Sequence, residues 1–199
     1  ELIVIDDAST DSSYDIASRY AAQDARIVLM GNDANHGAAY TRNRGLETAR
    51  GSFITFMDAD DRCSPERFAR QTAFFGQHPQ IDLCGSYYTM FGPDDAREQK
   101  IQDPITHEGI RIQMLFGCPF AMSGVMMRRG AFLRSGVRFR ATMAEDYLFW
   151  AELSGHMRMA NIPEHLSFYR RWENQLSTSQ LDRQTLSAQA IQRDLLRTT

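Results

Sequence analysis

Two short apolar runs near the start of the chain end abruptly in acidic residues. Residues 2–5 are followed by Asp6 and Asp7, and residues 53–57 are followed by the acidic turn 58–61. A short run that is apolar throughout is typical of a strand covered on both faces, as in parallel sheets. Open α/β sheets bind their ligands beyond the carboxyl ends of such strands, so both acidic groups are expected at one functional edge.

The segments between these runs have the periodicity of helices. The pattern predicts a helix over residues 12–23, a strand over 26–30 and a second helix over 38–49. This βαβαβ order implies an α/β fold with a mixed, mainly parallel sheet flanked by helices and right-handed crossovers. We therefore expect the three strands to be parallel members of one sheet, with their carboxyl ends lining one cleft.

The remainder of the chain continues the alternation. Helices are predicted over residues 64–76, 106–116, 145–155 and 181–197, strands over 82–91, 120–127, 157–162 and 165–172, and a polar loop over 92–104. We expect one α/β domain over residues 1–180 and a C-terminal amphipathic helix over residues 181–199. Because the polar face of that helix mixes Asp with Arg, packing on the domain is favoured over lying on a membrane surface.

The chain opens directly in a predicted core strand, with no initiator Met. A buried parallel strand needs neighbours on both sides, because unpaired backbone groups cost free energy when they are buried. We therefore expect the sequence to be a fragment that lost an upstream part, so that its first strand lies beside a gap or is poorly supported.

Charge and cysteine content exclude several classes of protein. The net charge of −3 gives no basis for bulk nucleic-acid binding. No window approaches the roughly 18 consecutive apolar residues of a transmembrane helix, so we expect no membrane span. Cys63, Cys84 and Cys118 are scattered and lack CxxC spacing, which indicates reduced thiols and a cytoplasmic location.

Asp58 and Asp60 are two residues apart, directly after the third predicted strand. Such spacing lets two carboxylates converge on one Mg²⁺ or Mn²⁺ ion, which take oxygen ligands. A solvated turn that caps the next helix is the competing interpretation. An EF-hand loop is excluded because Cys63 and Ala69 stand where it needs Gly and Glu. A phospho-accepting receiver domain would need a basic residue at a late strand end, whereas Lys100 lies in a polar loop.

A third acidic cluster, Glu145 and Asp146, begins a predicted helix, and Arg42 lies on the helix between the two acid-ended strands. An Arg at that place can pair with phosphate or hold the acids, and a solvated helix face is the simpler alternative. The sequence has no Gly-rich phosphate loop, so a nucleotide would be held by a metal ion instead.

Residues 2–11, LIVIDDASTD, resemble the IVVDDGSTD signature of family 2 glycosyltransferases, which have the GT-A fold. The resemblance continues in the same order along nearly the whole chain. The further matching segments are residues 35–37, 39–45, 51–61 with the DxD motif, 123–124, 128–129, 145–146 and 169–170, followed by Gln175 and Ser177.

This family resemblance implies an inverting, metal-dependent transfer of a sugar. The donor would be a nucleotide-diphospho-sugar, commonly a UDP-sugar, the acceptor a glycan or a lipid-linked glycoconjugate, and the cofactor Mn²⁺ or Mg²⁺. The expected setting is the assembly of a bacterial surface polysaccharide. The full-length protein would work in the cytoplasm or at the inner face of the membrane, through peripheral association.

The resemblance also implies roles for single residues near the donor. Asp7 resembles the acid that recognises the uracil base, with Asp6 beside it, and Arg42 resembles the basic residue near the nucleotide. Asp58 matches the first DxD acid, which faces the ribose or the metal. Asp60 matches the acid that ligates the metal.

On the acceptor side, Asp146 resembles the catalytic base, and Glu145 beside it is expected in the substrate site. Ser123 and Gly124 fall in the loop near the acceptor. Trp172 stands where the family often has a His that approaches the metal or the diphosphate, and it is expected to stack or pack instead. Two other functions remain open: a non-catalytic nucleotide-sugar-binding remnant, and a metal-dependent nucleotidyltransferase, which would release pyrophosphate.

Overall fold

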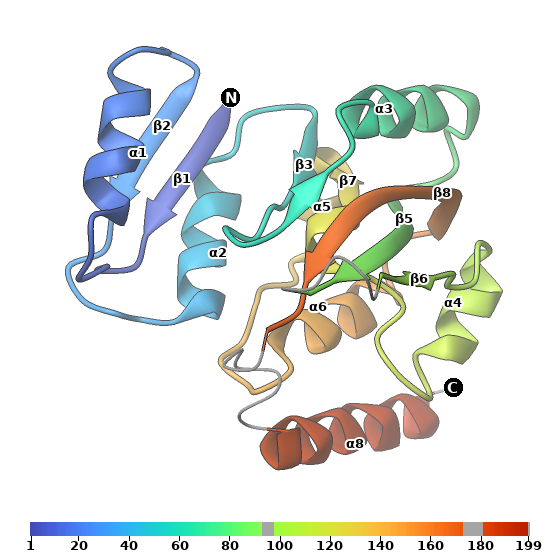
Figure 1. Cartoon of the computed structure of the whole chain (residues 1–199). Helices are drawn as coiled ribbons and strands as arrows, with labels where there is room; N and C mark the ends of the chain where they lie inside the picture. The colour runs from blue at the N-terminus through green and yellow to red at the C-terminus, as the bar shows by residue number, and fades with distance from the viewer. Residues whose placement is uncertain (93–97, 173–180, 199) are drawn as a thin grey trace.

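The computed structural model describes residues 1–92, 98–172 and 181–198, and its strands form two separate sheets (Figure 1). The small sheet contains β1 (Leu2–Asp6) and β2 (Ile27–Gly31), which pair in parallel. The large sheet has six strands in the order β3-β7-β5-β8-β4, with β6 beside β5. In Figure 1, α2 lies between the two sheets and α1 on the outer side of the small one.

The strands of the large sheet are of unequal length. They are β3 (Phe53–Thr55), β4 (Arg62–Cys63), β5 (Leu83–Phe91), β6 (Gln99–Ile101), β7 (Met126–Arg128) and β8 (Met159–Arg170). The two longest pairings in the molecule, β1 with β2 and β5 with β8, are parallel, and the four shorter ones are antiparallel. The large sheet is therefore mixed, as expected, but it is not mainly parallel, because only one of its five described pairings, β5 with β8, is parallel.

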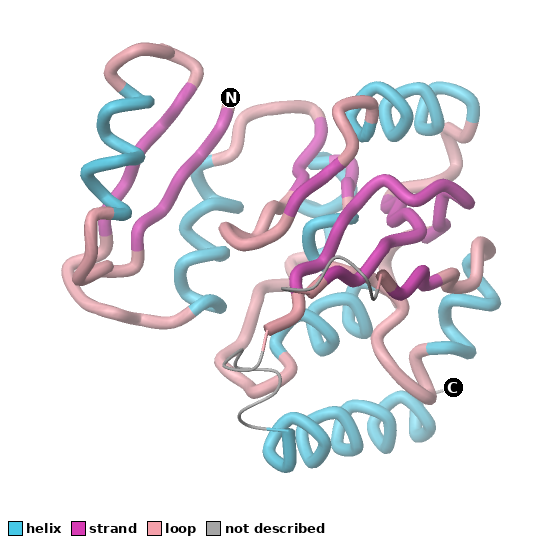
Figure 2. Tube along the Cα trace, viewed as in Figure 1, coloured by secondary structure: helices cyan, strands magenta, loops and turns pink. Residues whose placement is uncertain are grey.

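Most of the helices flank the large sheet, whereas α1 lies beside the small sheet (Figure 2). They are α1 (Ser13–Ala21), α2 (Ala38–Thr48), α3 (Arg67–Gln77), α4 (His107–Gln113), α5 (Arg129–Ser135), α6 (Glu145–Leu153) and α8 (Leu181–Thr198), with a 3₁₀ turn at Met122–Gly124. Among the described helices, none is long and apolar enough to cross a membrane.

The main core lies between the large sheet and α6. Leu83 on β5, Met159 on β8 and Trp150 on α6 are fully buried. Phe149 on α6 stacks on Phe139, with ring centroids 3.8 Å apart. This aromatic packing fixes the position of α6, whose first turn carries an acidic pair.

The expectation that the first three strands belong to one sheet is wrong. β3 pairs with β7 in the large sheet, whereas β1 pairs with β2 alone among the described strands. The Leu2 amide donates to the Arg26 carbonyl, and the Asp6 carbonyl accepts from Asn32. In a parallel strand alternate residues bond to alternate sides, so the backbone groups of Ile3 and Ile5 point to the opposite edge. No described strand pairs with that edge.

Two further differences concern strand boundaries. The two strands predicted at the end of the chain are one strand, β8, which continues through Pro163 and Glu164. The register with β5 jumps there, from Ile162 opposite Ser86 to His165 opposite Tyr87, so this irregularity accommodates the proline that lacks an N–H. The predicted polar loop contains the short strand β6, which only its pairing with β5 defines.

The C-terminal helix α8 packs against α6 (Figure 1). Ile191 is buried and belongs to the main core, and Ala188 and Leu195 pack against that core. The helix therefore covers the domain surface, as expected from its mixed polar face. The division of the chain at residue 180 remains a prediction, and residues 173–180, with Gln175 and Ser177, lie outside the described residues.

Candidate active site

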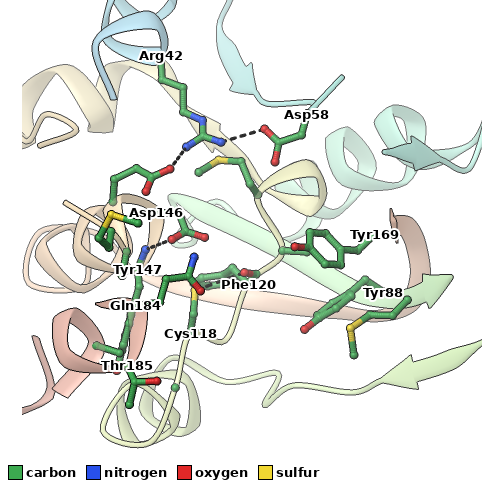
Figure 3. A pocket seen from close by; sticks show the side chains of 18 of the residues that line it. Arg42, Asp58, Tyr88, Cys118, Phe120, Asp146, Tyr147, Tyr169, Gln184 and Thr185 are labelled. Carbon is green, nitrogen blue, oxygen red and sulfur yellow. Dashed lines mark hydrogen bonds and ion pairs between the residues drawn. The ribbon is translucent and has the colours of Figure 1, made fainter. Parts of the chain in front are cut away.

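A cavity of about 760 Å³ brings together charged residues from three distant segments. Arg42 comes from α2, Asp58 and Asp60 from the turn after β3, and Glu145 and Asp146 from the start of α6. In Figure 3 the arginine lies at one end of the view with Asp58, and Asp146 lies nearer the middle. The sequence separates these segments by up to about a hundred residues, so only the fold assembles them.

Arg42 bridges two of the acids. Its guanidinium donates to Asp58 Oδ1 at 2.9 Å and to Glu145 Oε1 at 2.8 Å, and its side chain is only 18% exposed. Burial alone would lower the pKa of Arg42, but the charge of Asp58 and its hydrogen bond, followed by Glu145, outweigh burial and raise it. Arg42 therefore holds the acids and does not lie on a solvated helix face.

The turn that carries Asp58 and Asp60 is fixed from both sides. The Asp58 amide donates to Ser123 Oγ at 2.9 Å. Arg170 on β8 donates its amide to Asp61 Oδ1 at 2.8 Å and its Nε to the Asp60 carbonyl at 2.7 Å. Asp58 and Asp60 of this turn line the cavity.

Asp61 titrates unusually within this turn. Burial raises its pKa to about 6, and the charges of Asp58 and Asp60 act in the same direction, against the hydrogen bonds from Ser123 and Arg170. Its Oδ2 is buried, and no described group bonds to it. Asp61 therefore supports the turn, and its carboxyl group carries a proton at mildly acidic pH.

Arg67 and Gln71 on α3 support the turn that carries Asp58 and Asp60, and the sequence analysis did not predict either residue. Arg67 is fully buried and donates to the Ser123 carbonyl, to Thr55 Oγ1 and to the Phe56 carbonyl. Gln71 accepts from Arg67 at 3.1 Å. The spacing in the sequence could have indicated that Arg67 and Gln71 are buried. Positions 67, 71 and 75 share one helix face, and Phe75 on that face is buried. Polar residues on an inward face indicate a buried network.

Ser123 and Gly124 occupy the 3₁₀ turn before β7 and are buried. The Gly124 carbonyl accepts from Gln71 Nε2 at 2.8 Å, and a Cβ on Gly124 would lie 2.8 Å from Ser167 Oγ. Neither residue lines the cavity, although both were expected near the acceptor. Ser123 holds the Asp58 turn through the Asp58 amide, and the expected role of both residues near the acceptor stays a prediction.

Asp6 and Asp7 lie at the carboxyl end of β1 and do not line the cavity. The Asp7 carboxylate accepts from the backbone amides of His36 at 2.9 Å and Gly37 at 2.7 Å and from Asn32 Nδ2 at 2.5 Å. Burial opposes ionisation of Asp7, but these hydrogen bonds prevail and lower its pKa. Asp6 accepts from the amide three residues later. Asp7 thus anchors the start of α2, the helix that carries Arg42.

Asp146 lies in the first turn of α6, half-buried at the cavity wall. Its Oδ1 accepts from the Tyr147 amide at 2.7 Å, so it satisfies one amide at the helix start. Burial raises the pKa of Asp146, and the charge of Glu145 adds to this effect. A carboxylate with a raised pKa is a better proton acceptor once it is ionised.

The carboxylates at the cavity suit a hard divalent cation that is bound partly by the protein and partly by a bound ligand. Asp58 and Asp60 both line the cavity, and Arg42 occupies only one oxygen of Asp58. The described residues contain no group of three or more side chains suited to hold a metal ion by themselves. Mg²⁺ and Mn²⁺ often bind through one or two carboxylates plus the phosphates of a substrate, and the pair of aspartates is of that kind.

Comparison with solved structures identifies the fold as GT-A. The TarS protein of S. aureus in complex with UDP-GlcNAc is similar over 90% of this chain and 52% of its own, with a TM-score of 0.73 and 23% identity. A mannosyltransferase from Pyrobaculum calidifontis in complex with GDP-Man and Mn²⁺ is similar over 94% of this chain and 54% of its own, with a TM-score of 0.68 and 16% identity. The expected fold class is thereby confirmed.

The sequence itself defines the family. Residues 1–136 match the family described as glycosyl transferase family 2, and the chain belongs to it. A Haemophilus influenzae protein described as an uncharacterized glycosyltransferase is 30% identical over 98% of this chain and 63% of its own length. The chain thus spans less than two thirds of that relative.

Proposed function

We propose that this chain is the donor-binding and catalytic part of an inverting glycosyltransferase. It would move a sugar from a nucleotide-diphospho-sugar, with UDP as the preferred nucleotide, to a glycan or lipid-linked acceptor. The observation that carries this proposal is the cavity in which Arg42 joins the Asp58 turn to Glu145, and which Asp60 and Asp146 also line. The structural relatives with bound UDP-GlcNAc and GDP-Man support a nucleotide-sugar donor.

The donor side of the site would divide the work between two groups of acids. Asp7, directly after β1, is assigned to the base, with Asp6 beside it. Asp58 and Asp60 are assigned to Mn²⁺ or Mg²⁺. When bound, the cation supplies positive charge that stabilises the departing diphosphate. Arg42, which pairs with both Asp58 and Glu145, would keep these two acids in position when the donor binds.

On the acceptor side, Asp146 is assigned as the general base. It takes the proton of the acceptor hydroxyl as the hydroxyl oxygen forms a bond to the anomeric carbon. The bond between that carbon and the diphosphate oxygen breaks, and the nucleoside diphosphate leaves with the electron pair. Attack from the face opposite the diphosphate inverts the anomeric configuration. The raised pKa of Asp146 suits this role.

The cellular setting follows from the family resemblance and belongs to the same proposal. The reaction would build a bacterial surface polysaccharide in the cytoplasm or at the inner face of the membrane, where the full-length protein would associate peripherally.

A direct test compares UDP-, GDP- and TDP-sugars as ligands of the full chain, with and without Mn²⁺ or Mg²⁺. We expect cation-dependent thermal stabilisation by one nucleotide class, and Asp60→Ala should abolish it because the cation loses a ligand. Ala59→Ser, a change between the two aspartates, is the matched control and should keep the stabilisation. Full stabilisation of Asp60→Ala in the presence of a chelator would contradict the metal assignment.

The products separate the three candidate functions. Glycosyl transfer yields a nucleoside diphosphate and a glycosylated acceptor. A nucleotidyltransferase would release pyrophosphate, and a non-catalytic remnant would bind the donor without turnover. Mass spectrometry of the nucleotide and acceptor products distinguishes these outcomes.

A further inference from the structure

The cavity has two chemically distinct parts. Every charged side chain among its described lining residues belongs to the group already discussed, which spans Arg42, the Asp58 turn and the start of α6. The other part, here called the neutral half, contains aromatic and amide side chains. Its principal residues are Tyr88, Tyr169, Trp172, Gln184, Ala188 and Gln192.

The aromatic side of the neutral half comes from the paired strands β5 and β8. Tyr169 lies opposite Met90, and Tyr88 is two residues from Met90, so all three side chains lie on one face of the sheet. Trp172 lies two residues beyond the end of β8, lines the cavity and is 49% exposed. Figure 3 shows the two tyrosine rings at the end of the cavity away from Arg42. The sheet thus presents flat apolar surfaces to the cavity.

The amide side of the neutral half comes from α8. Gln184, Ala188 and Gln192 are spaced four residues apart, so they form one stripe along the helix, and all three line the cavity. The small alanine leaves space between the two amides. An amide group both donates and accepts hydrogen bonds, so this stripe can pair with hydroxyl groups in either direction.

Together these groups match the surface of a pyranose. A sugar ring has a face of C–H groups, which the negative face of an aromatic ring attracts, and an equator of hydroxyls, which amides bind. The described lining of the neutral half offers no charge to pair with a carboxylate or a phosphate. The chemistry therefore favours an uncharged sugar over a uronic acid or a lipid phosphate.

We propose that the neutral half is the acceptor subsite, and that it binds a neutral sugar unit of the acceptor with the attacking hydroxyl directed to Asp146. In Figure 3 Asp146 lies between the Arg42–Asp58 end of the cavity and the labelled Gln184, as this arrangement requires. The inference rests on the proposed glycosyltransferase function, and it makes α8 part of the substrate site.

The test measures binding of two neutral probes, methyl β-D-glucopyranoside and N-acetylglucosamine, to the full chain by saturation-transfer NMR. D-glucuronate is the charged comparison, and each probe is measured with and without UDP and Mn²⁺. We expect a neutral probe to bind, and glucuronate to bind more weakly. Trp172→Ala should weaken the neutral probe roughly three- to tenfold, the range expected for losing one aromatic contact.

Matched controls separate the subsite from general destabilisation. Gln184→Ala should weaken the neutral probe, whereas Gln189→Ala, an exposed amide on the same helix that does not line the cavity, should not. Phe68→Ala, an exposed aromatic of similar accessibility on α3, is the control for Trp172→Ala. Equal binding by Trp172→Ala and Gln184→Ala and the wild type would overturn the proposal, as would equal binding of glucuronate or no binding of either neutral probe.

Donor binding is read separately, by thermal stabilisation with UDP and Mn²⁺. Asp60→Ala should lose the donor signal and keep the sugar signal measured without nucleotide. Trp172→Ala should keep the donor signal and have a weaker sugar signal. Failure of the subsite and failure of the donor assignment are therefore distinguishable.

Discussion

The small sheet and the large sheet are built from similar apolar strands but differ in how well they are covered. β1 and β2 contain no buried residue, and neither does α1 beside them. In the large sheet, Leu83 and Cys84 on β5 are fully buried. Strand sequence alone does not determine burial, because burial depends on which elements lie on the faces and edges of the sheet.

The difference matters for function because the proposed site draws on both regions. Asp7, assigned to the base, and Asp6 beside it lie at the end of a strand of the small sheet. Asp58, Asp60 and Asp146 rest on the large sheet and α6. Local stability follows buried contacts, so the nucleotide end of the site should open more readily than the catalytic end.

The largest contrast should appear in turnover. Asp146→Asn keeps a hydrogen-bond acceptor for the helix start but cannot accept the proton, so kcat should fall by roughly 10²–10⁴-fold with folding intact. Asp7→Asn, in the small-sheet region, should mainly weaken donor binding. Steady-state kinetics with thermal melts measures both. If Asp146→Asn loses stability yet turns over normally, the residue is only a helix cap.

Core truncation should distinguish the two sheets next. Leu83→Ala creates a cavity in a fully buried site and should cost about 2–5 kcal/mol of unfolding free energy. Val4→Ala on the half-buried β1 should cost about 1 kcal/mol or less, because little buried volume is lost. Chemical denaturation of both variants checks this. Equal losses would show that β1 is as well supported as β5.

Replacing one arginine in each region should change the unfolding free energy by a smaller amount. Arg67→Met leaves buried carbonyls of the Asp58 turn without donors and should cost roughly 1–3 kcal/mol, with weaker donor binding. Arg44→Met removes hydrogen bonds to the Gly31 carbonyl of β2 and to Asn32 Oδ1, where water can replace the lost donor, and should cost roughly 0.5 kcal/mol. If donor affinity is unchanged in Arg67→Met, the buried network does not position the turn.

The smallest contrast is in the pH dependence of folding stability. One carboxyl group in each region should change stability with pH in opposite directions. The pKa of Asp7 is lowered against its burial by hydrogen bonds, so its stabilising contribution is present above about pH 4 and is lost as pH falls. Burial raises the pKa of Asp103, next to β6, so its contribution is present below about pH 4 and is lost as pH rises through the raised value.

Thermal midpoints of Asp7→Asn and Asp103→Asn between about pH 3 and pH 7 measure these contributions. Asp7→Asn should flatten the acid limb of the wild-type profile, and Asp103→Asn should remove a decline toward neutral pH. Parallel profiles for both variants and the wild type would contradict the assigned signs.

Much of the architecture follows from local sequence pattern. The apolar runs that became β1, β2, β3 and β5, and the helical spacing that became α2, are visible without coordinates. The separation of β1 from β3 is not visible, because it depends on which strands meet at their edges. β6 is too short to have a period of its own and exists through its pairing with β5.

The candidate site shows the same division. The acids were identifiable because three acidic clusters begin or end predicted elements. The bridge from Arg42 to both Asp58 and Glu145 needed the fold, since these residues are far apart in sequence. Arg67 was missed because an arginine in the first turn of a helix usually lies in water, and only its shared face with Phe75 indicates otherwise.

The Arg42 bridge also sets the charge balance of the cavity. One guanidinium faces four carboxylates on the described walls, so the resting cavity has an excess of negative charge. A nucleoside diphosphate is itself an anion, and like charges at close range in a partly buried site repel. The donor should therefore enter together with its cation rather than alone, which makes its apparent affinity a function of cation concentration.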